Sequence, residues 1–442
     1  MKSIKFKIII LSWFGLLFFA TPTMAASVAQ QHTMENGLNV LLIEAHNVPM
    51  VAMKLIMPAG SRFDAKHKGG SAALLSGLLM DHTKHYGYQD WAAKLDDAAI
   101  RMGTSVDQDA LSISLTVLKE ADDEGMQALA EVVLQPGWDK QRFILLKSNA
   151  ISAATKAQEE ATTHAGKAAA QLLFPNHPYG HAVSGSIGSL KNIQLADLKR
   201  IFQQQVKPEG ATLAVSGDIS MKELVALLQQ YLGSWQGHPK QRLSDIEAPR
   251  PLSQTSKVIM MDKHQTLVEW IRLGPSRHDK DYTALLVLNH MLGGGGFGSR
   301  LMEEVREKRG LTYGVFSWFQ PLETSGVYRI RLQTRADQAT QAEKVLREVL
   351  QGFADGNISQ DELEKSKQNL MGGFAQRMDS NRERAGLLAM MGLYQRPLNY
   401  LENWTTSVES VTLGDVKRLA TLYLQPSDWK RVLVGPKQMQ AK

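Results

Sequence analysis

An arginine and a tyrosine with six residues between them, Arg306 and Tyr313, have the spacing to meet at one site. Both side chains are hydrogen-bond donors, so together they could hold an acceptor oxygen. Residues 299–308 are expected to form a short helix that stops at Gly310, and a strand is expected to start at Tyr313. The two side chains would then converge across this turn. The alternative is that Arg306 pairs with Glu303 on a solvated helix face and that Tyr313 is an ordinary sheet aromatic.

Four consecutive glycines, Gly293, Gly294, Gly295 and Gly296, precede this helix. With a fifth glycine two residues later they formally match the pattern G-x-G-x-x-G. A dinucleotide site needs a strand before such glycines, whereas residues 282–292 have helical character, and no Gly-Lys-Ser/Thr follows. We therefore expect a tightly turning connection that lets another backbone, including that of a substrate, approach closely.

Two pairs of histidines have spacings at which they could act as metal ligands. His82 and His85 are close in sequence but have no third ligand near them. His177 and His181 are separated by a proline and a glycine, which prevent the two side chains from sharing a helical face. We therefore expect no metal site in either pair.

The N-terminus, residues 1–25, has the pattern of a secretory signal peptide, with a basic start, a short apolar stretch and a small-residue exit. The apolar stretch is too short to span a membrane. We therefore expect a cleaved leader and a periplasmic chain without a membrane anchor. The 442-residue chain has no cysteine and a net charge of +6, and removal of Lys2, Lys5 and Lys7 with the leader leaves +3. No run of basic residues interleaved with aromatics occurs, so nucleic acid is not an expected partner.

The chain contains an internal repeat. Residues 189–201 (SLKNIQLADLKRI) are similar to residues 407–419 (SVESVTLGDVKRL), at an offset of 218 residues. The same offset relates the strand-like residues 214–217 and 432–435. An offset that holds across a helix and the next strand indicates two copies of one domain.

A segment rich in prolines and charges, 237–254, is the expected linker between an N-terminal domain at 26–236 and a C-terminal domain at 255–442. Each half mixes alternating strand patterns, such as 111–118, with long amphipathic helices, such as 339–353. The expected class is α+β, with two homologous domains that each consist of an antiparallel sheet packed with helices.

The glycine run followed by SRLMEEVREKRGLTYGV, the segment FPNHPYGHAVSGSIGSL at 174–190 and the export signal together resemble the pitrilysin and insulysin family of zinc metallopeptidases. Half-size bacterial members and the subunits of the mitochondrial processing peptidase belong to this family. The resemblance covers essentially the whole mature chain. It implies that Arg306 and Tyr313 lie opposite a metal, where they hold substrate and help to stabilise the oxyanion.

The family's metal site is the motif H-x-x-E-H on a helix of the first domain, in which two histidines bind zinc and the glutamate is the general base. The matching helix here is 69–82, where Ala73, Ser76 and Gly77 occupy the positions of His, Glu and His. The third ligand, a glutamate, should fall within 141–158, which contains no acidic residue. The resemblance therefore implies that this chain has lost the zinc site.

A chain that keeps the Arg/Tyr pair and lacks the zinc ligands is similar to one half of a divided active site. We expect the non-zinc subunit of a periplasmic heterodimeric peptidase, with zinc in a homologous partner that has the intact motif and with unfolded peptide as substrate. The alternative is a catalytically silent protein that binds peptide or serves in assembly. An active peptidase with a metal site elsewhere is a third possibility.

Overall fold

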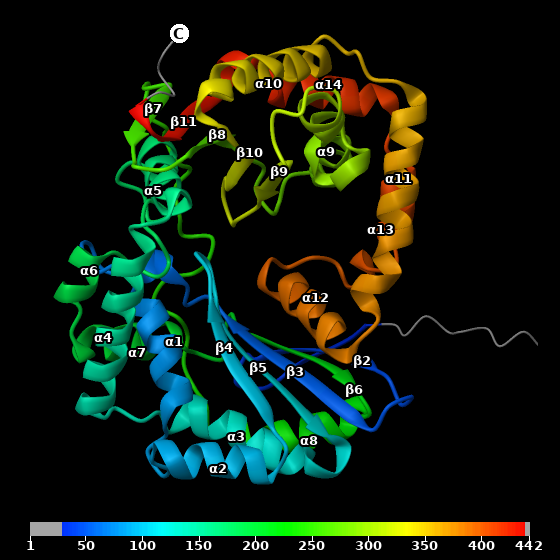
Figure 1. Cartoon of the computed structure of the whole chain (residues 1–442). Coiled ribbons are helices and arrows are strands. Elements are labelled where there is room, and N and C mark those ends of the chain that lie inside the picture. The colour runs from blue at the N-terminus through cyan, green and yellow to red at the C-terminus, as the bar shows by residue number, and fades with distance from the viewer. Residues whose placement is uncertain (1–28, 438–442) are drawn as a thin grey trace, which may run out of the picture.

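The computed structural model describes residues 29–437, so the expected leader lies outside the described residues. Two β-sheets, each packed with helices, form two domains (Figure 1). The predicted α+β class with two domains is confirmed. Between residues 29 and 437, none of the helices has the length and apolar character needed to cross a membrane.

The first sheet has six strands in the order β1-β2-β6-β3-β5-β4. These strands are β1 (Gln30–Thr33), β2 (Asn39–Glu44), β3 (Met50–Met57), β4 (Arg101–Val106), β5 (Leu111–Leu118) and β6 (Thr212–Gly217). Strands β2 and β6 are parallel, and all other neighbours are antiparallel.

The second sheet has five strands in the order β7-β11-β8-β10-β9. These strands are β7 (Ser256–Met260), β8 (Gln265–Leu273), β9 (Val315–Gln320), β10 (Val327–Arg335) and β11 (Lys430–Gly435). Apart from β1, both sheets have the same strand order, in which the last strand of the domain lies between the first and the second. This shared topology supports the two-copy interpretation of the sequence.

The expectation of purely antiparallel sheets needs correction. The last strand of each domain, β6 or β11, pairs in parallel with the first, β2 or β7. Parallel neighbours need a long crossover connection, and in each domain the intervening strands and helices supply it.

The first domain contains eight α-helices within the described residues, and all of them except α5 contribute buried residues to a single apolar core with the sheet. The eight are α1 (Ser71–Asp81), α2 (Tyr88–Asp97), α3 (Asp122–Leu134), α4 (Lys140–Ala157), α5 (Ala161–Leu173), α6 (Ile187–Asn192), α7 (Leu195–Gln205) and α8 (Met221–Leu232). The core includes the alternate residues Ile113, Leu115 and Val117 of β5, as the period of two along a strand predicts.

The second domain is built in the same way around its own core. Its α-helices within the described residues are α9 (Tyr282–Asn289), α10 (Ala339–Ala354), α11 (Gln360–Phe374), α12 (Asn381–Leu393), α13 (Trp404–Glu409) and α14 (Leu413–Tyr423). Helices α9, α10 and α14 cover one face of the second sheet (Figure 1).

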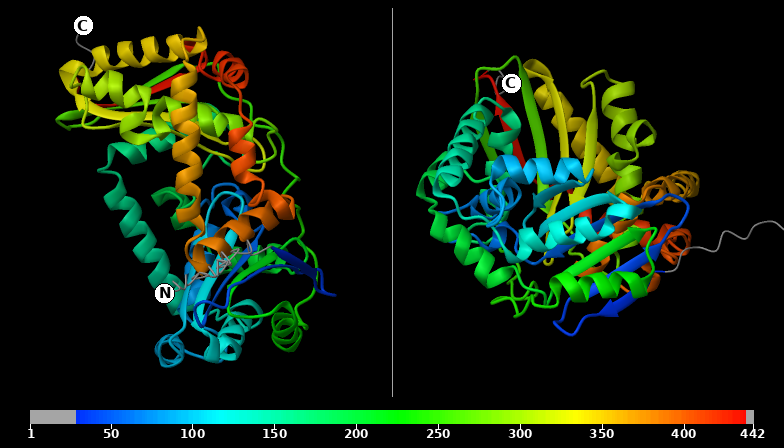
Figure 2. Two further views of the ribbon diagram at one scale, coloured as in Figure 1. Left: turned by 90° about the vertical axis from the view of Figure 1, so that its right-hand side faces the viewer. Right: turned by 90° about the horizontal axis from the view of Figure 1, so that it is seen from below.

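Each half of the chain also contributes one helix to the sheet of the other half. Helix α5 packs its alanine and leucine side chains on β8 and β11 of the second sheet. Helix α12 packs Leu388 and Met391 on the first sheet, against Ile43 and Ala214. The long helix α11 runs between the domains and leads into α12 (Figures 1 and 2). Neither sheet is therefore covered by residues of its own half alone, which the sequence pattern did not predict.

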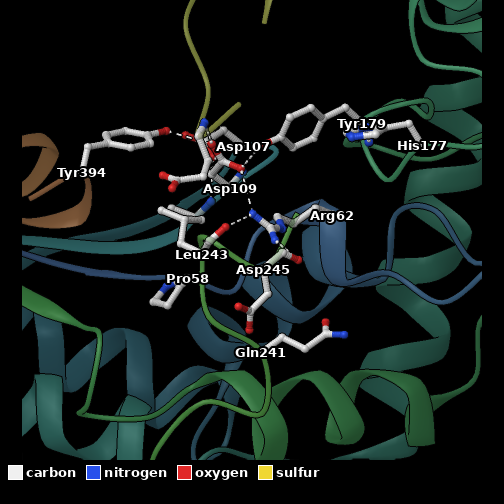
Figure 3. A network of polar contacts seen from close by, with 12 residues as sticks. Pro58, Arg62, Asp107, Asp109, His177, Tyr179, Gln241, Leu243, Asp245 and Tyr394 are labelled. Atoms are coloured by element: carbon white, nitrogen blue, oxygen red, sulfur yellow. Dashed lines mark hydrogen bonds and ion pairs between the residues drawn. The ribbon is translucent and has the colours of Figure 1, made fainter. Parts of the chain in front are cut away.

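A fully buried carboxylate, Asp109, joins the two domains at the turn between β4 and β5 (Figure 3). The hydroxyl groups of Tyr179 and Tyr394 donate to its two oxygens at 2.5 and 3.0 Å. The backbone N–H of Glu323, in the turn between β9 and β10, donates at 2.8 Å. The guanidinium of Arg62 completes the environment at 3.7 Å.

Arg62 extends this network to the linker, where it donates to the backbone oxygens of Leu243 at 2.6 Å and Asp245 at 3.2 Å. Burial and the neighbouring carboxylate raise the pKa of Tyr179 and of Tyr394, so both hydroxyls stay protonated donors. Both sheets, the linker and the segments that follow α5 and α12 thus meet at one carboxylate.

We predict that Asp109→Ala lowers the free energy of unfolding by about 3–5 kcal/mol, because the change leaves Arg62 buried without its counter-charge. Urea denaturation followed by circular dichroism would measure the loss. The matched control is Asp337→Ala, which removes an exposed carboxylate paired with Arg335 and should cost less than about 1 kcal/mol. Equal losses in the two variants would refute the role given to Asp109.

Candidate functional site

The glycine run follows a helix, as the sequence predicted, and not the strand that a dinucleotide site requires. Helix α9 continues into a π-helical turn, His290–Gly294. A Cβ at Gly293 would lie 2.7 Å from the backbone nitrogen of Ser317 on β9, so glycine is required for this close approach. Gly293 is buried by the contact, and the other three glycines reach the surface. The expectation that the glycine run contacts a substrate can therefore apply only to those three.

Arg306 lies in the last turn of the short helix after the glycines, which is a π-helical segment, Met302–Glu307. The chain then reverses at Gly310, whose φ is +62° and whose N–H donates to the carbonyl of Arg306 at 2.9 Å. Tyr313 precedes β9 by two residues, and is therefore not the first residue of the strand as the sequence suggested. Tyr313 itself lies at the bend before the strand, and its side chain is exposed.

The structure brings Arg306 and Tyr313 together. The guanidinium carbon of Arg306 lies 5.2 Å from the centre of the Tyr313 ring, a cation–π contact. Glu303, the rival partner, pairs with Lys308 at 2.8 Å. Arg306 forms no ion pair among residues 29–437, so its guanidinium remains available to a ligand.

A third residue, Phe297, belongs to this site, and the sequence reasoning missed it. Its ring lies 4.5 Å from the guanidinium carbon of Arg306, which is therefore held between two aromatic rings. The side chain of Phe297 is 67% exposed and that of Tyr313 is 90% exposed. Phe297 stands between Gly296 and Gly298, where no helix or strand pattern requires a large aromatic side chain. This position in the sequence indicates a role at the surface.

The three positions of the lost metal motif lie on α1, where their side chains supply no ligand. Ser76 is buried, and its carbonyl accepts a hydrogen bond from Thr104 of β4 at 2.9 Å. Gly77 is exposed, and a Cβ there would meet no atom within 4 Å. Ala73 is half-buried. In the described range, 29–437, no three His, Asp or Glu side chains cluster in a way that could hold a metal.

The histidines considered from the sequence have structural partners. His82 is buried, contacts Asp81 through Nδ1 at 2.9 Å and accepts from the Asp139 N–H through Nε2 at 3.1 Å. His85 contacts a different carboxylate, Glu131, at 3.0 Å. Both nitrogens of His82 are thus used within the fold, and the two rings serve separate contacts.

The His177 and His181 pair is also divided between different partners. His177 contacts the linker carbonyl of Glu247 through Nε2 at 2.9 Å, and its Nδ1 accepts from the Tyr179 N–H. His181 contacts the carbonyl of Ala182. These contacts fix the turn after α5 that brings Tyr179 to Asp109.

Helix α1 begins beside a half-buried carboxylate, Asp64, which binds the first N–H groups of the helix. Asp64 accepts hydrogen bonds from the N–H groups of Gly70 at 2.7 Å and Ala72 at 2.8 Å, two donors that have no partner within the helix. Burial raises the pKa of the Asp64 carboxyl to about 6.

Two family models match successive parts of the chain. Residues 39–184 match the family described as insulinase (peptidase family M16), and residues 192–370 match the family described as the peptidase M16 inactive domain.

Similar proteins match over almost the whole chain. The non-peptidase homolog YmxG of Helicobacter pylori is 24% identical, over 94% of this chain and 95% of its own length. The zinc protease PqqE of Helicobacter pylori is 23% identical, over 91% and 92%. A crystal structure of a peptidase M16 inactive domain from Pseudomonas fluorescens superimposes with a TM-score of 0.88 and 30% identity, and the match covers 92% of this chain and 98% of that one.

Fold and sequence similarity together define a peptidase homologue. The chain belongs to peptidase family M16, and the proteins similar to it include one described as a non-peptidase homolog.

The capping carboxylate of α1 predicts a pH dependence of stability. Because the pKa of Asp64 is raised on folding, the folded protein binds a proton more tightly than the unfolded chain. The stabilisation from this proton is present below about pH 4 and is lost as the pH rises to about 6. We compare the unfolding free energy of the wild type with that of Asp64→Asn. The difference, wild type minus variant, should fall by about 1–3 kcal/mol over this range. Urea denaturation at intervals from pH 4 to pH 7 would measure it.

The control for this measurement is Asp361→Asn, which removes an exposed carboxylate in the first turn of α11. Its difference from the wild type should stay nearly flat over the same range. A flat difference for Asp64→Asn as well would contradict the assignment.

Proposed function

We propose that this chain is the non-zinc subunit of a heterodimeric periplasmic metallopeptidase, and that it contributes Arg306 and Tyr313 to a shared active site. One observation carries the proposal: the pair is assembled and open to solvent, whereas α1 offers no metal ligand. The exposure of Tyr313 matters most, because an ordinary sheet aromatic would bury most of its ring.

Within the shared site, this chain binds and polarises the peptide. The partner's zinc, when bound, supplies Lewis acidity and an activated water. The hydroxyl of Tyr313 and the guanidinium of Arg306 donate hydrogen bonds to the carbonyl oxygen that becomes negatively charged during attack. The rings of Phe297 and Tyr313 both contact the guanidinium and favour its placement at the site before the charge develops, which assists electrostatic stabilisation.

The substrate in this proposal is an unfolded, extended peptide. An extended chain can add as a strand to a sheet edge in the partner's first domain, and such main-chain pairing accepts many sequences. The surface glycines, Gly294 to Gly296, carry no side chains and let the peptide pass close to the Arg/Tyr pair. Folded proteins are excluded because the two subunits enclose the site.

A second candidate function, a catalytically silent peptide-binding or assembly protein, is favoured by one finding. The relative from Helicobacter pylori described as a non-peptidase homolog matches 94% of this chain. In that case the exposed Arg306 and Tyr313 bind peptide without taking part in cleavage.

The first function is tested by expressing this chain together with a homologous exported chain that contains H-x-x-E-H and measuring peptide cleavage by the purified complex. We expect Tyr313→Phe to lower kcat about 100-fold, because an oxyanion donor is lost. Arg306→Ala should lower kcat similarly and also raise KM. The melting temperature should not change for Tyr313→Phe, since the side chain is exposed.

The matched control is Lys308→Ala, which removes a positive charge from the same segment, where it pairs with Glu303 and Glu304. Its kcat should stay within about twofold of the wild type. Equal cleavage by all variants would exclude a shared site. A stable complex that cleaves normally without either side chain, or the failure of any zinc-binding chain to associate, would favour the binding-protein function.

A further inference from the structure

A pair of arginines converges on one buried carboxylate on the second sheet. Glu269 of β8 is fully buried, and its Oε1 lies 2.7 Å from Nη1 of Arg329 and 2.8 Å from Nη2 of Arg331, both on β10. The other oxygen, Oε2, has no hydrogen-bond partner among the described residues. Two guanidinium groups facing one carboxylate leave an excess positive charge.

The arginines lie on the same face of the sheet as α5, beside the part that this helix covers. Helix α5 packs on this face over β8 and β11. Over β9 and β10 the face is open, and the side chains of Arg329 and Arg331 remain 18% and 29% exposed. Part of each side chain therefore reaches solvent while its guanidinium contacts Glu269.

Two aromatic side chains of β9 flank the arginines. Phe316 is the cross-strand neighbour of Arg331, and Trp318 is that of Arg329. The guanidinium carbon of Arg331 also lies 5.3 Å from the centre of the Trp318 ring. Phe316 is 51% exposed, so the open face combines a positive charge with apolar rings.

This surface is continuous with the Arg306 site. The ring of Phe316 folds back over Gly314, where a Cβ would lie 3.0 Å from it, and Gly314 directly follows Tyr313. Four aromatic side chains are highly exposed within the described residues, and three of them, Phe297, Tyr313 and Phe316, lie together here. Clustered exposed aromatics are typical of interaction surfaces.

We propose that the open face of β9 and β10, formed by Phe316, Trp318, Arg329 and Arg331, is a subsite for an acidic side chain of an extended peptide. The carboxylate of the peptide binds the outer N–H groups of the two arginines, and its neighbouring residues pack on the rings. This inference rests on the proposed function for the identity of the ligand as a peptide.

The geometry also sets the position of the acidic residue in the peptide. Phe316 and Trp318 follow Tyr313 by three and five residues along the chain. An extended peptide alongside β9 advances by about 3.3 Å per residue, as the strand itself does. The acidic side chain is therefore expected roughly three to five residues from the peptide bond held at Arg306 and Tyr313.

The subsite can be tested on the isolated full chain, without a partner or cleavage. Two fluorescently labelled, unstructured peptides of equal length would be compared by anisotropy, one with two glutamates and the other with glutamines at the same positions. We expect the glutamate peptide to bind about tenfold more tightly at low salt, through charge-assisted hydrogen bonds. This preference should shrink as salt is added.

Arg331→Gln should abolish the preference for the glutamate peptide. Glu269 keeps Arg329 as its partner in this variant, so the fold should be maintained. The melting temperature of the variant would check this. The matched control is Arg335→Gln, which removes a charge from the same face of β10 outside the cluster, where Arg335 pairs with Asp337. This control should keep the preference. Phe316→Ala, at an exposed position, should weaken both peptides alike and serves as a second variant if Arg331→Gln does not fold.

Equal affinity of the wild type for the two peptides, or no binding of either, would overturn the subsite. Loss of the preference in Arg335→Gln as well would also overturn it, because a general positive field would then explain the result. None of these outcomes depends on whether a zinc-binding partner exists, so a failure here is distinct from a failure of the proposed shared active site.

Discussion

The buried carboxylate of Asp109 constrains the arrangement of the whole molecule. A desolvated negative charge must be matched by donors, and here the donors come from both halves of the chain: Tyr179 from the turn after α5, Tyr394 from the end of α12, and the backbone of Glu323 from the second sheet. Separation of the domains would remove the two donors that Tyr394 and Glu323 contribute, and the lost hydrogen bonds to a charged group would cost free energy. The position of the second sheet, and of the Arg/Tyr pair before β9, is set by this requirement.

The reciprocal packing of helices has the same effect over a larger area. Because α5 covers part of the second sheet and α12 covers part of the first, the apolar surface of each sheet is buried only when both halves are present. Burial of apolar surface is the dominant favourable term in folding. The two copies of the domain therefore form one cooperative structure, although each has its own sheet and core.

Loss of the metal ligands is compatible with this fold because the ligand positions contribute little to the core. The residues that anchor α1 are its leucines, such as Leu75 and Leu78, which are buried in the first core. Gly77 points to open space, and the N-terminus of the helix is held by Asp64. Phe297, Arg306 and Tyr313 lie on the surface, where they expose two aromatic rings and a guanidinium without an ion pair among residues 29–437. Exposed clusters of this kind contribute little to the core and are typical of interaction sites.

The α+β class and the two-copy organisation were predictable from the sequence, because they follow from local periodicity and from a fixed offset. The resemblance to zinc metallopeptidases implied that positions 73, 76 and 77 carry no zinc ligand. The spacing of Arg306 and Tyr313 allowed either their convergence or a pair between Arg306 and Glu303, and the folded chain selected the first. Three contacts became visible only in the folded chain. Phe297 contacts Arg306, and Arg329 and Arg331 share the carboxylate of Glu269. Helix α5 packs on the second sheet, and α12 packs on the first. These contacts join residues that are distant in sequence, and their partners are chosen by packing, burial and charge compensation in the folded chain, which no local pattern records.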